Sequence, residues 1–118
     1  MTYRVYGISS CDTVRKACKW LAEKGFEVER VDFRKTPPSP ERVAQWVEQF
    51  GSKALRNTSG GAYRALSADK TQWSEQGWIE AFSSNPMLIK RPVIERDGQA
   101  VQVGFRGSEE ELTARLIG

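Results

Sequence analysis

The chain reads Tyr6-Gly7-Ile8-Ser9-Ser10-Cys11-Asp12-Thr13-Val14-Arg15-Lys16 near its N-terminus. The apolar residues 3–8 predict a short strand, and a small polar turn leads into a helix that begins at or just after Cys11. A thiol at that point faces unpaired backbone N–H groups, which stabilise a thiolate, and Arg15 adds a positive charge one turn later. A buried structural cysteine also suits such a junction, so this stretch alone leaves both roles open.

The composition is that of one folded domain. The chain has 118 residues, of which 39% are hydrophobic and 28% charged, and this balance argues against a disordered or fibrous protein. No apolar run approaches the ~18–20 residues of a membrane span, and the first residues lack a signal peptide. The sequence therefore predicts a cytoplasmic protein with no membrane partner.

Charge and residue usage exclude several function classes. The net charge of +3 comes from 18 Lys and Arg scattered among 15 Asp and Glu, so we expect no nucleic-acid partner, whereas an anionic small molecule or peptide would fit. The chain has no histidine, which excludes Ser/His and Cys/His catalysis and most zinc sites, and we expect no metal. Two cysteines in a reducing compartment are not expected to form a structural disulfide.

Apolar periodicity predicts the first three elements. A helix over residues 13–24 carries a core-facing stripe, and Gly25 stands where a left-handed cap ends such a helix. A second strand follows over residues 27–33. A strand, a crossover helix and a strand predict a right-handed parallel βαβ unit.

Residues 37–86 predict an all-helical insertion. Ser39 is a helix N-cap followed by proline, and the helix after it has one apolar face. Residues 52–62 predict a glycine-rich polar loop, residues 63–66 a short helical turn, and residues 74–83 a further helix.

The remaining residues predict a β-hairpin and a closing helix. Asp97-Gly98 is a turn signal between two strands, and Ser108 with Glu111 forms a capping box. The order β-α-β, helical insertion, β-β-α is that of an α/β, thioredoxin-like (glutaredoxin-like) fold interrupted after its second strand. We therefore expect a thioredoxin-like domain over residues 1–36 and 87–118, with a helical insertion subdomain over residues 37–86.

Four short motifs lie in register with this order. They are Tyr6-Gly7, Cys11-x-x-x-Arg15-Lys16-Ala17, Lys90-Arg91-Pro92 and Gly104-Phe105-Arg106. Together they resemble the arsenate reductase-like (ArsC/Spx) family, which includes glutaredoxin-linked arsenate reductases, Spx transcriptional regulators and the YffB branch. The resemblance covers essentially the whole chain.

Within this family the chain looks most like the YffB branch, because Leu55-x-Asn57-Thr58 is followed by Tyr63-Arg64-x-Leu66. Spx proteins carry a Cys-x-x-Cys pair whose second cysteine would fall on Val14 here. A two-cysteine switch at that spacing is therefore excluded.

The resemblance implies a site around one nucleophilic cysteine. Arsenate reductases bind their oxyanion with three arginines, of which two are matched here, and the third place falls on Asn57 with Arg56 one residue away. The proline after Arg91 is the one that thioredoxin folds hold cis beside the thiol. The implied residues are the nucleophile Cys11, the anion- or glutathione-binding residues Arg15, Arg56, Arg91, Pro92 and Arg106, and the supporting residues Ser10 and Asn57.

The second cysteine is poorly placed to resolve a disulfide. Seven helical residues separate Cys11 from Cys18, a rise of about 10.5 Å, whereas disulfide-bonded Cα atoms lie roughly 4.4–6.8 Å apart. Cys18 also lies on the apolar stripe, which favours a structural role. An external thiol would then be needed, and glutathione is the obvious co-substrate.

Three hypotheses follow. The first is a glutathione-dependent thiol oxidoreductase, with glutaredoxin as a possible protein partner. The second is an arsenate reductase coupled to glutathione or glutaredoxin. The third is a non-catalytic, Spx-like regulatory protein that binds RNA polymerase or another protein. A monomer is the default for this family.

Overall fold

The computed structural model describes all residues, 1–118, and the chain divides into two compact units. The first comprises residues 1–35 and 91–118, and the second comprises residues 36–90. The first unit thus ends one residue earlier, and resumes four residues later, than the domain boundaries expected from the sequence.

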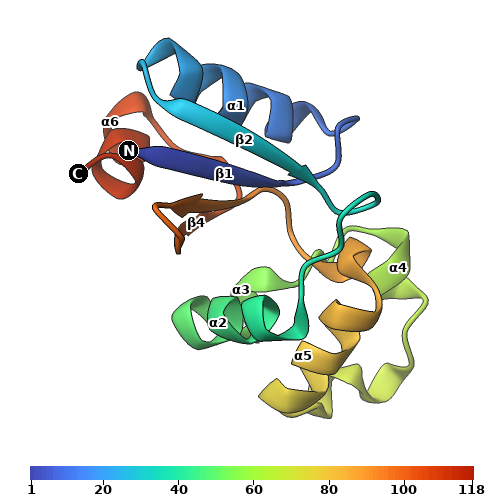
Figure 1. The fold of residues 1–118 in the computed structure, drawn as a ribbon. Coiled ribbons are helices and arrows are strands. Elements are labelled where there is room, and N and C mark those ends of the chain that lie inside the picture. Colours follow the sequence, from blue (N-terminus) through green and yellow to red (C-terminus); the bar gives the residue numbers. More distant parts are fainter. The chain divides into compact units, whose positions relative to one another are not determined.

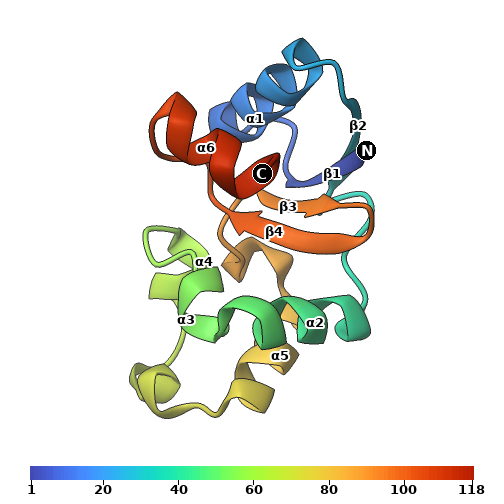
Figure 2. The ribbon, with the colours of Figure 1, turned by 90° about the vertical axis from the view of Figure 1, so that its left-hand side faces the viewer.

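The first unit is built on a four-stranded sheet with the strand order β2-β1-β3-β4. β1 pairs in parallel with β2, and β3 pairs antiparallel with both β1 and β4. Two helices, α1 and α6, lie on the same face of this sheet (Figures 1 and 2). The element bounds are β1 Thr2–Gly7, α1 Asp12–Glu23, β2 Glu27–Asp32, β3 Val93–Arg96, β4 Gln99–Val103 and α6 Glu109–Leu116. This is the thioredoxin-like fold that the element order predicts.

The predicted stripe of α1 is its buried face. Its members are Val14, Ala17, Cys18 and Leu21. They pack with side chains of the sheet and of α6, namely Tyr3, Val5, Ile94, Leu112 and Leu116. The helix ends at Glu23 and is followed by the cap residue Lys24 and by Gly25, whose φ of 88° is costly for a side chain with a Cβ. The periodicity therefore identified the core of this unit correctly.

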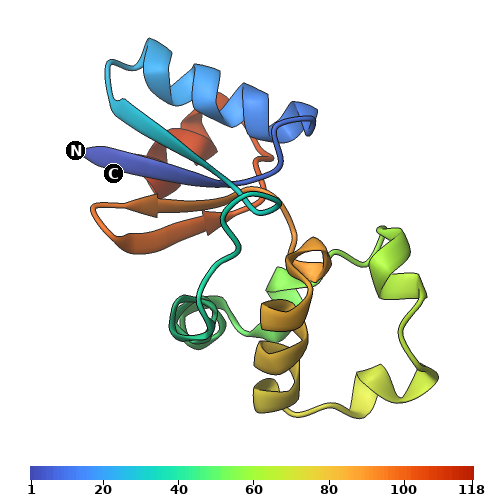
Figure 3. The same ribbon diagram turned by 45° about the vertical axis from the view of Figure 1, so that its right-hand side comes forward.

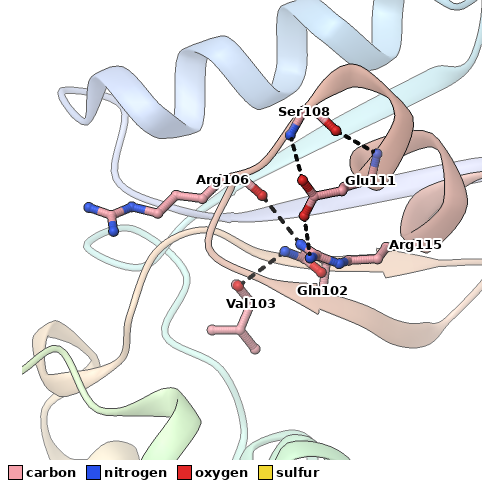
Figure 4. Close-up of polar contacts among 6 residues, drawn as sticks. All are labelled: Gln102, Val103, Arg106, Ser108, Glu111 and Arg115. Atoms are coloured by element: carbon pink, nitrogen blue, oxygen red, sulfur yellow. Dashed lines mark hydrogen bonds and ion pairs between the residues drawn. The ribbon is translucent and has the colours of Figure 1, made fainter.

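Two short sequence motifs determine local structure in the C-terminal half of the first unit. Asp97 and Gly98 have φ values of 50° and 87°, the two positive values of a type I′ hairpin turn between β3 and β4. The capping box of α6 is present, because the Glu111 N–H donates to Ser108 Oγ at 3.1 Å and the Ser108 N–H donates to Glu111 Oε1 at 3.4 Å (Figure 4). Both predicted turn motifs are confirmed.

The second unit is helical (Figure 3). α2 packs against α5 and α3, and Ser39 and Ser74 cap α2 and α5 as N-cap acceptors. The buried core is apolar and includes Val43, Trp46, Val47, Leu55, Trp78 and Phe82. The bounds are α2 Pro40–Phe50, α3 Ser52–Leu55, α4 Gly61–Arg64, η1 Ala68–Gln72, α5 Glu75–Ser84 and η2 Pro86–Leu88.

One prediction in this unit is wrong in part. Residues 52–62 are not a continuous loop, because Ser52–Leu55 forms a helical turn. The residues after this turn pair with the last residues of the second unit. Arg56 forms an antiparallel β-bridge with Ile89, and the Asn57 N–H donates to the Leu88 carbonyl at 2.8 Å. A turn this short carries too few residues for an apolar period to show in the sequence.

None of the helices in either unit combines the length and the apolar composition that a membrane crossing requires.

Candidate functional site

Cys11 is the N-cap residue of α1. Its backbone is extended, with φ −82° and ψ 120°, and no side chain caps the helix. The Cys11 N–H closes the preceding turn on the Ile8 carbonyl at 3.1 Å, and the Cys11 carbonyl accepts the first helical bond from Arg15 at 3.1 Å. The thiol is half-buried. It therefore lies where the first-turn N–H groups have no side-chain acceptor of their own, as the sequence predicts.

The positive charge expected from Arg15 is balanced within the helix. Its guanidinium forms an ion pair with the carboxylate of Asp12, and both side chains are exposed. Exposed pairs of this kind contribute little to stability. Ser10, the other neighbour, is exposed at the turn before Cys11.

Cys18, unlike Cys11, is buried. It is 5% exposed and belongs to the core of the first unit. Burial raises the pKa of the Cys18 thiol, and the charge and hydrogen bond of Arg30 oppose that shift. Because a thiolate is the nucleophile in disulfide exchange, Cys18 is a poor reactant, in agreement with its structural interpretation.

The Arg91-Pro92 peptide bond is cis, as the resemblance implies. Pro92 is buried and Arg91 is half-buried. A Cβ built on Gly7, the last residue of β1, would lie 3.6 Å from the Arg91 Cβ and 2.5 Å from Val14 Cγ2. Arg91 therefore lies beside the end of β1, at the edge of the sheet where the turn to Cys11 begins.

Arg106 lies in the connection between β4 and α6. That connection is held at both ends, because the Gly104 N–H donates to the Pro92 carbonyl at 2.7 Å and Arg115 Nη1 donates to the Arg106 carbonyl at 3.3 Å. Arg115 in turn pairs with Glu111, and the side chain of Arg106 extends away from that pair (Figure 4). The backbone of Arg106 is thus fixed while its exposed guanidinium points away from the capping network.

Asp32, which the sequence analysis did not select, lies opposite Gly7 at the ends of the paired strands β1 and β2. Its Oδ1 accepts the Arg34 N–H at 2.9 Å. This bond forms an Asx-turn, for which an Asp at the end of a strand is the sequence signal. The Arg34 N–H, followed by the Ser9 donors and the charge of Lys35, lowers the pKa of Asp32, although burial acts against them.

Arg56 is engaged inside the helical unit. Its guanidinium carbon lies 4.2 Å from the Trp78 ring centroid, and its Nη2 donates to Ser52 Oγ at 2.8 Å. Ser52 donates from Oγ at 2.5 Å and from its N–H at 2.9 Å to the carboxylate of Glu75. This arrangement gives Arg56 a structural role in its own unit.

Asn57, the position at which the third arginine would fall, also makes local contacts. Its amide donates to the Met87 carbonyl at 3.4 Å, and its side-chain oxygen accepts from the Ser59 hydroxyl at 3.3 Å. An anion-binding role for Arg56 or Asn57 stays a prediction.

The hydrogen bonds between Glu75 and Ser52 predict that the stability of the protein depends on pH. The two Ser52 hydrogen bonds lower the pKa of Glu75, helped by the charge of Arg56, while burial raises it. Because the folded-state pKa is lowered, the stabilisation is full above the unfolded value of about 4.3 and is lost as the pH falls through the folded value. We expect Glu75→Gln to lower the free energy of unfolding at pH 7 and to have a smaller effect at pH 3, measured by urea denaturation.

Glu80→Gln, on the same helix α5, is the matched control and should change stability little at either pH. An equal loss for Glu75→Gln at both values would contradict the charge-based explanation.

No group of three or more His, Cys, Asp or Glu side chains in the structure could hold a metal ion.

Comparisons with known proteins find a matching family model and similar sequences. A model of the ArsC family matches residues 6–113. The protein YusI of Bacillus subtilis is 38% identical over 115 residues, covering 94% of this chain and 97% of its own length. The global transcriptional regulator Spx of Streptococcus agalactiae is 29% identical over 109 residues, covering 91% and 77%.

Solved structures of similar fold cover nearly the whole chain. A YffB protein superposes with a TM-score of 0.84 at 33% identity, covering 97% of this chain and 98% of its own. A possible arsenate reductase from Streptococcus mutans superposes with a TM-score of 0.81 at 33% identity, covering 93% and 96%. The chain belongs to the ArsC family, among relatives that include arsenate reductase-like proteins and Spx regulators.

Proposed function

We propose that this protein is a glutathione-dependent thiol oxidoreductase that reacts through Cys11 alone. The observation that carries the proposal is the contrast between the two thiols. Cys11 is accessible at the start of α1, while Cys18 is buried and its pKa is raised. A protein with one reactive thiol cannot close an internal disulfide, so a second thiol must come from solution.

The reaction proceeds in two exchanges. The Cys11 thiolate attacks the glutathione sulfur of a mixed disulfide between glutathione and the substrate. A Cys11–glutathione disulfide forms, and the substrate leaves as a thiolate, which takes a proton from water. A second glutathione thiolate then attacks the glutathione sulfur of that intermediate. Cys11 leaves as a thiolate and oxidised glutathione is released; one half of it comes from the mixed disulfide and the other from the one reduced glutathione that each cycle consumes.

The two arginines of the site favour the binding of a thiol that carries negative charge. Arg91 lies beside Gly7, and the exposed guanidinium of Arg106 comes from the connection that binds the Pro92 carbonyl. Glutathione carries two carboxylates, for which guanidinium groups are the preferred partners. We infer that Arg91 and Arg106 bind these carboxylates and that the backbone around Pro92 pairs with the glutathione peptide.

The test is a mixed disulfide at a defined residue. Wild-type protein, reduced and then incubated with oxidised glutathione, is expected to gain one glutathione, and peptide mapping by mass spectrometry should place it on Cys11. Addition of reduced glutathione should release it. An unmodified protein, or an adduct on Cys18, would refute the proposal.

Arsenate reduction is the second candidate, because a structural neighbour is a possible arsenate reductase. Reduction of arsenate to arsenite takes two electrons, which glutathione could supply through Cys11. Arg56 argues against it, since its guanidinium already contacts Trp78 and Ser52. A glutathione- and glutaredoxin-coupled arsenate assay separates the candidates: turnover that disappears in Cys11→Ser would favour the arsenate reductase.

A further inference from the structure

We propose that Trp20 is a positioning residue for the glutathione site: it holds the connection between β4 and α6 against α1 and so fixes the backbone from which Arg106 extends. The inference rests on the proposed function, because the position of Arg106 affects the reaction only if this arginine binds glutathione. Trp20 lies in the second half of α1 and is half-buried. It is not part of the buried stripe of that helix, so its partners must lie beside the core.

The Trp20 side chain contacts the connection on both sides of Arg106. Its ring lies edge-on to the Phe105 ring, with the centroids 5.8 Å apart and the planes at 67°. Its Nε1 donates to Oε2 of Glu109, the first residue of α6, at 2.6 Å. Phe105 comes directly before Arg106, and Glu109 comes three residues after it. One side chain of α1 therefore restrains the chain before and after the arginine.

Lys24 strengthens the contact with Glu109. It lies one turn after Trp20 and forms an ion pair with the same carboxylate, and its Nζ lies 5.1 Å from the Trp20 ring centroid. The hydrogen bonds from Lys24 and Trp20 lower the pKa of Glu109, although burial acts against them, so the acceptor is ionised at neutral pH. Because the ion pair is exposed, it contributes little by itself. Trp20 is the residue that adds packing against Phe105 to the hydrogen bond.

The connection needs such contacts because glycines flank its central residues. Gly104 and Gly107 enclose Phe105 and Arg106, and their φ values are 77° and 125°. Glycine has the greatest backbone freedom, so a segment between two glycines changes direction easily unless other contacts hold it. The hydrogen bonds of the Gly104 N–H and of the Arg106 carbonyl involve residues outside α1. The contacts of Trp20 thus supply a restraint relative to α1.

A restraint relative to α1 is also a restraint relative to the thiol. Cys11 is the N-cap of this helix, and Cys11, Trp20 and Phe105 all pack against the same buried core. Binding groups that are already in place lose less freedom when a ligand binds, and this strengthens binding. Loss of the Trp20 contacts should therefore weaken the binding of glutathione through Arg106 and leave the chemistry of the thiol unchanged.

The experiment compares Trp20→Leu, Arg106→Ala and the double variant with the control Phe26→Leu. Phe26 is also a half-buried aromatic residue packed against this core, but its ring partner is Tyr3, with the centroids 5.0 Å apart. The rate of glutathione adduct formation at Cys11 is measured against the concentration of oxidised glutathione, which gives a half-saturating concentration and a limiting rate. Iodoacetamide, a small neutral alkylator, reports the reactivity of the thiol itself.

We expect Trp20→Leu to raise the half-saturating concentration about fivefold, the effect of about one typical hydrogen bond. Its limiting rate and its iodoacetamide rate should stay near wild type. In the Arg106→Ala background the same substitution should have no further effect, because the group that Trp20 positions is absent. Amide hydrogen exchange over residues 105–107 should quicken in Trp20→Leu. Phe26→Leu should leave the half-saturating concentration and this exchange near wild type.

Three outcomes would overturn the inference. In the first, Phe26→Leu raises the half-saturating concentration as much as Trp20→Leu, which would mean that both act through stability. In the second, Trp20→Leu leaves this concentration unchanged. In the third, Trp20→Leu keeps its full effect in the Arg106→Ala background, which would mean that it does not act through Arg106. If wild type forms no glutathione adduct, the proposed function fails, and the exchange over residues 105–107 alone then decides whether Trp20 holds the connection.

Discussion

Replacing Cys11 by serine is expected to abolish glutathione adduct formation and every turnover that depends on it. A serine hydroxyl at this N-cap keeps the size of the side chain and can accept an N–H of the first turn, so α1 should persist or gain stability. It has no sulfur with which to form the mixed disulfide, however. The expected loss in rate is therefore complete within detection, in a protein whose thermal unfolding is unchanged or higher.

The matched variant is Cys18→Ala, which removes the buried thiol from the core stripe of α1. We expect it to lower the free energy of unfolding by about 1 kcal/mol, as a typical core truncation does, while glutathione adduct formation keeps its rate. Residual turnover in Cys11→Ser that disappears only when Cys18 is also replaced would mean that the buried thiol takes part, contrary to the one-thiol mechanism.

The first unit could be predicted closely because its signals are local. The stripe of α1, the left-handed Gly25, the Asp97-Gly98 turn and the capping box at Ser108 each need only a few neighbouring residues, and all occur as expected. Periodicity and turn chemistry act over such distances. They also placed Cys11 correctly at the start of the helix.

The contacts that determine what each charged residue does could not be predicted in the same way. Counting along the chain places Arg56 near the expected third arginine, but its guanidinium contacts Trp78, twenty-two residues further on. Asp32 has a recognisable turn signal, yet its place opposite Gly7 depends on the parallel register of two strands separated by a helix. Long side chains choose their partners in three dimensions, and a single sequence does not contain that information.

The other large effect is expected at Gly7, the last residue of β1, against which Val14 of α1 packs. A Cβ at this position would lie 2.5 Å from Val14 Cγ2, well inside any normal contact. Valine in a helix has one strongly preferred rotamer, so Val14 cannot turn aside cheaply and α1 must shift as a whole. Overpacking of this kind costs about 1–3 kcal/mol, and we expect Gly7→Ala to lower the free energy of unfolding by that amount in urea denaturation.

The same shift of α1 should also slow the reaction of Cys11. Val14 and Cys11 belong to the first turn of one helix, so moving α1 away from Gly7 also displaces the Cys11 thiol. Small displacements of a reacting group can cost about a hundredfold in rate, and oxidised glutathione should therefore react more slowly with Gly7→Ala than its stability loss explains.

Gly61→Ala is the control for Gly7→Ala, because a Cβ there meets no atom within 4 Å and its backbone needs no positive φ. It should be neutral or slightly stabilising. Adding Val14→Ala to Gly7→Ala removes the clashing methyl groups, so the two substitutions should cost less together than the sum of their separate costs. Strict additivity would mean that contact with Val14 does not exclude a side chain from Gly7, and that the thiol is not held in place by this close approach.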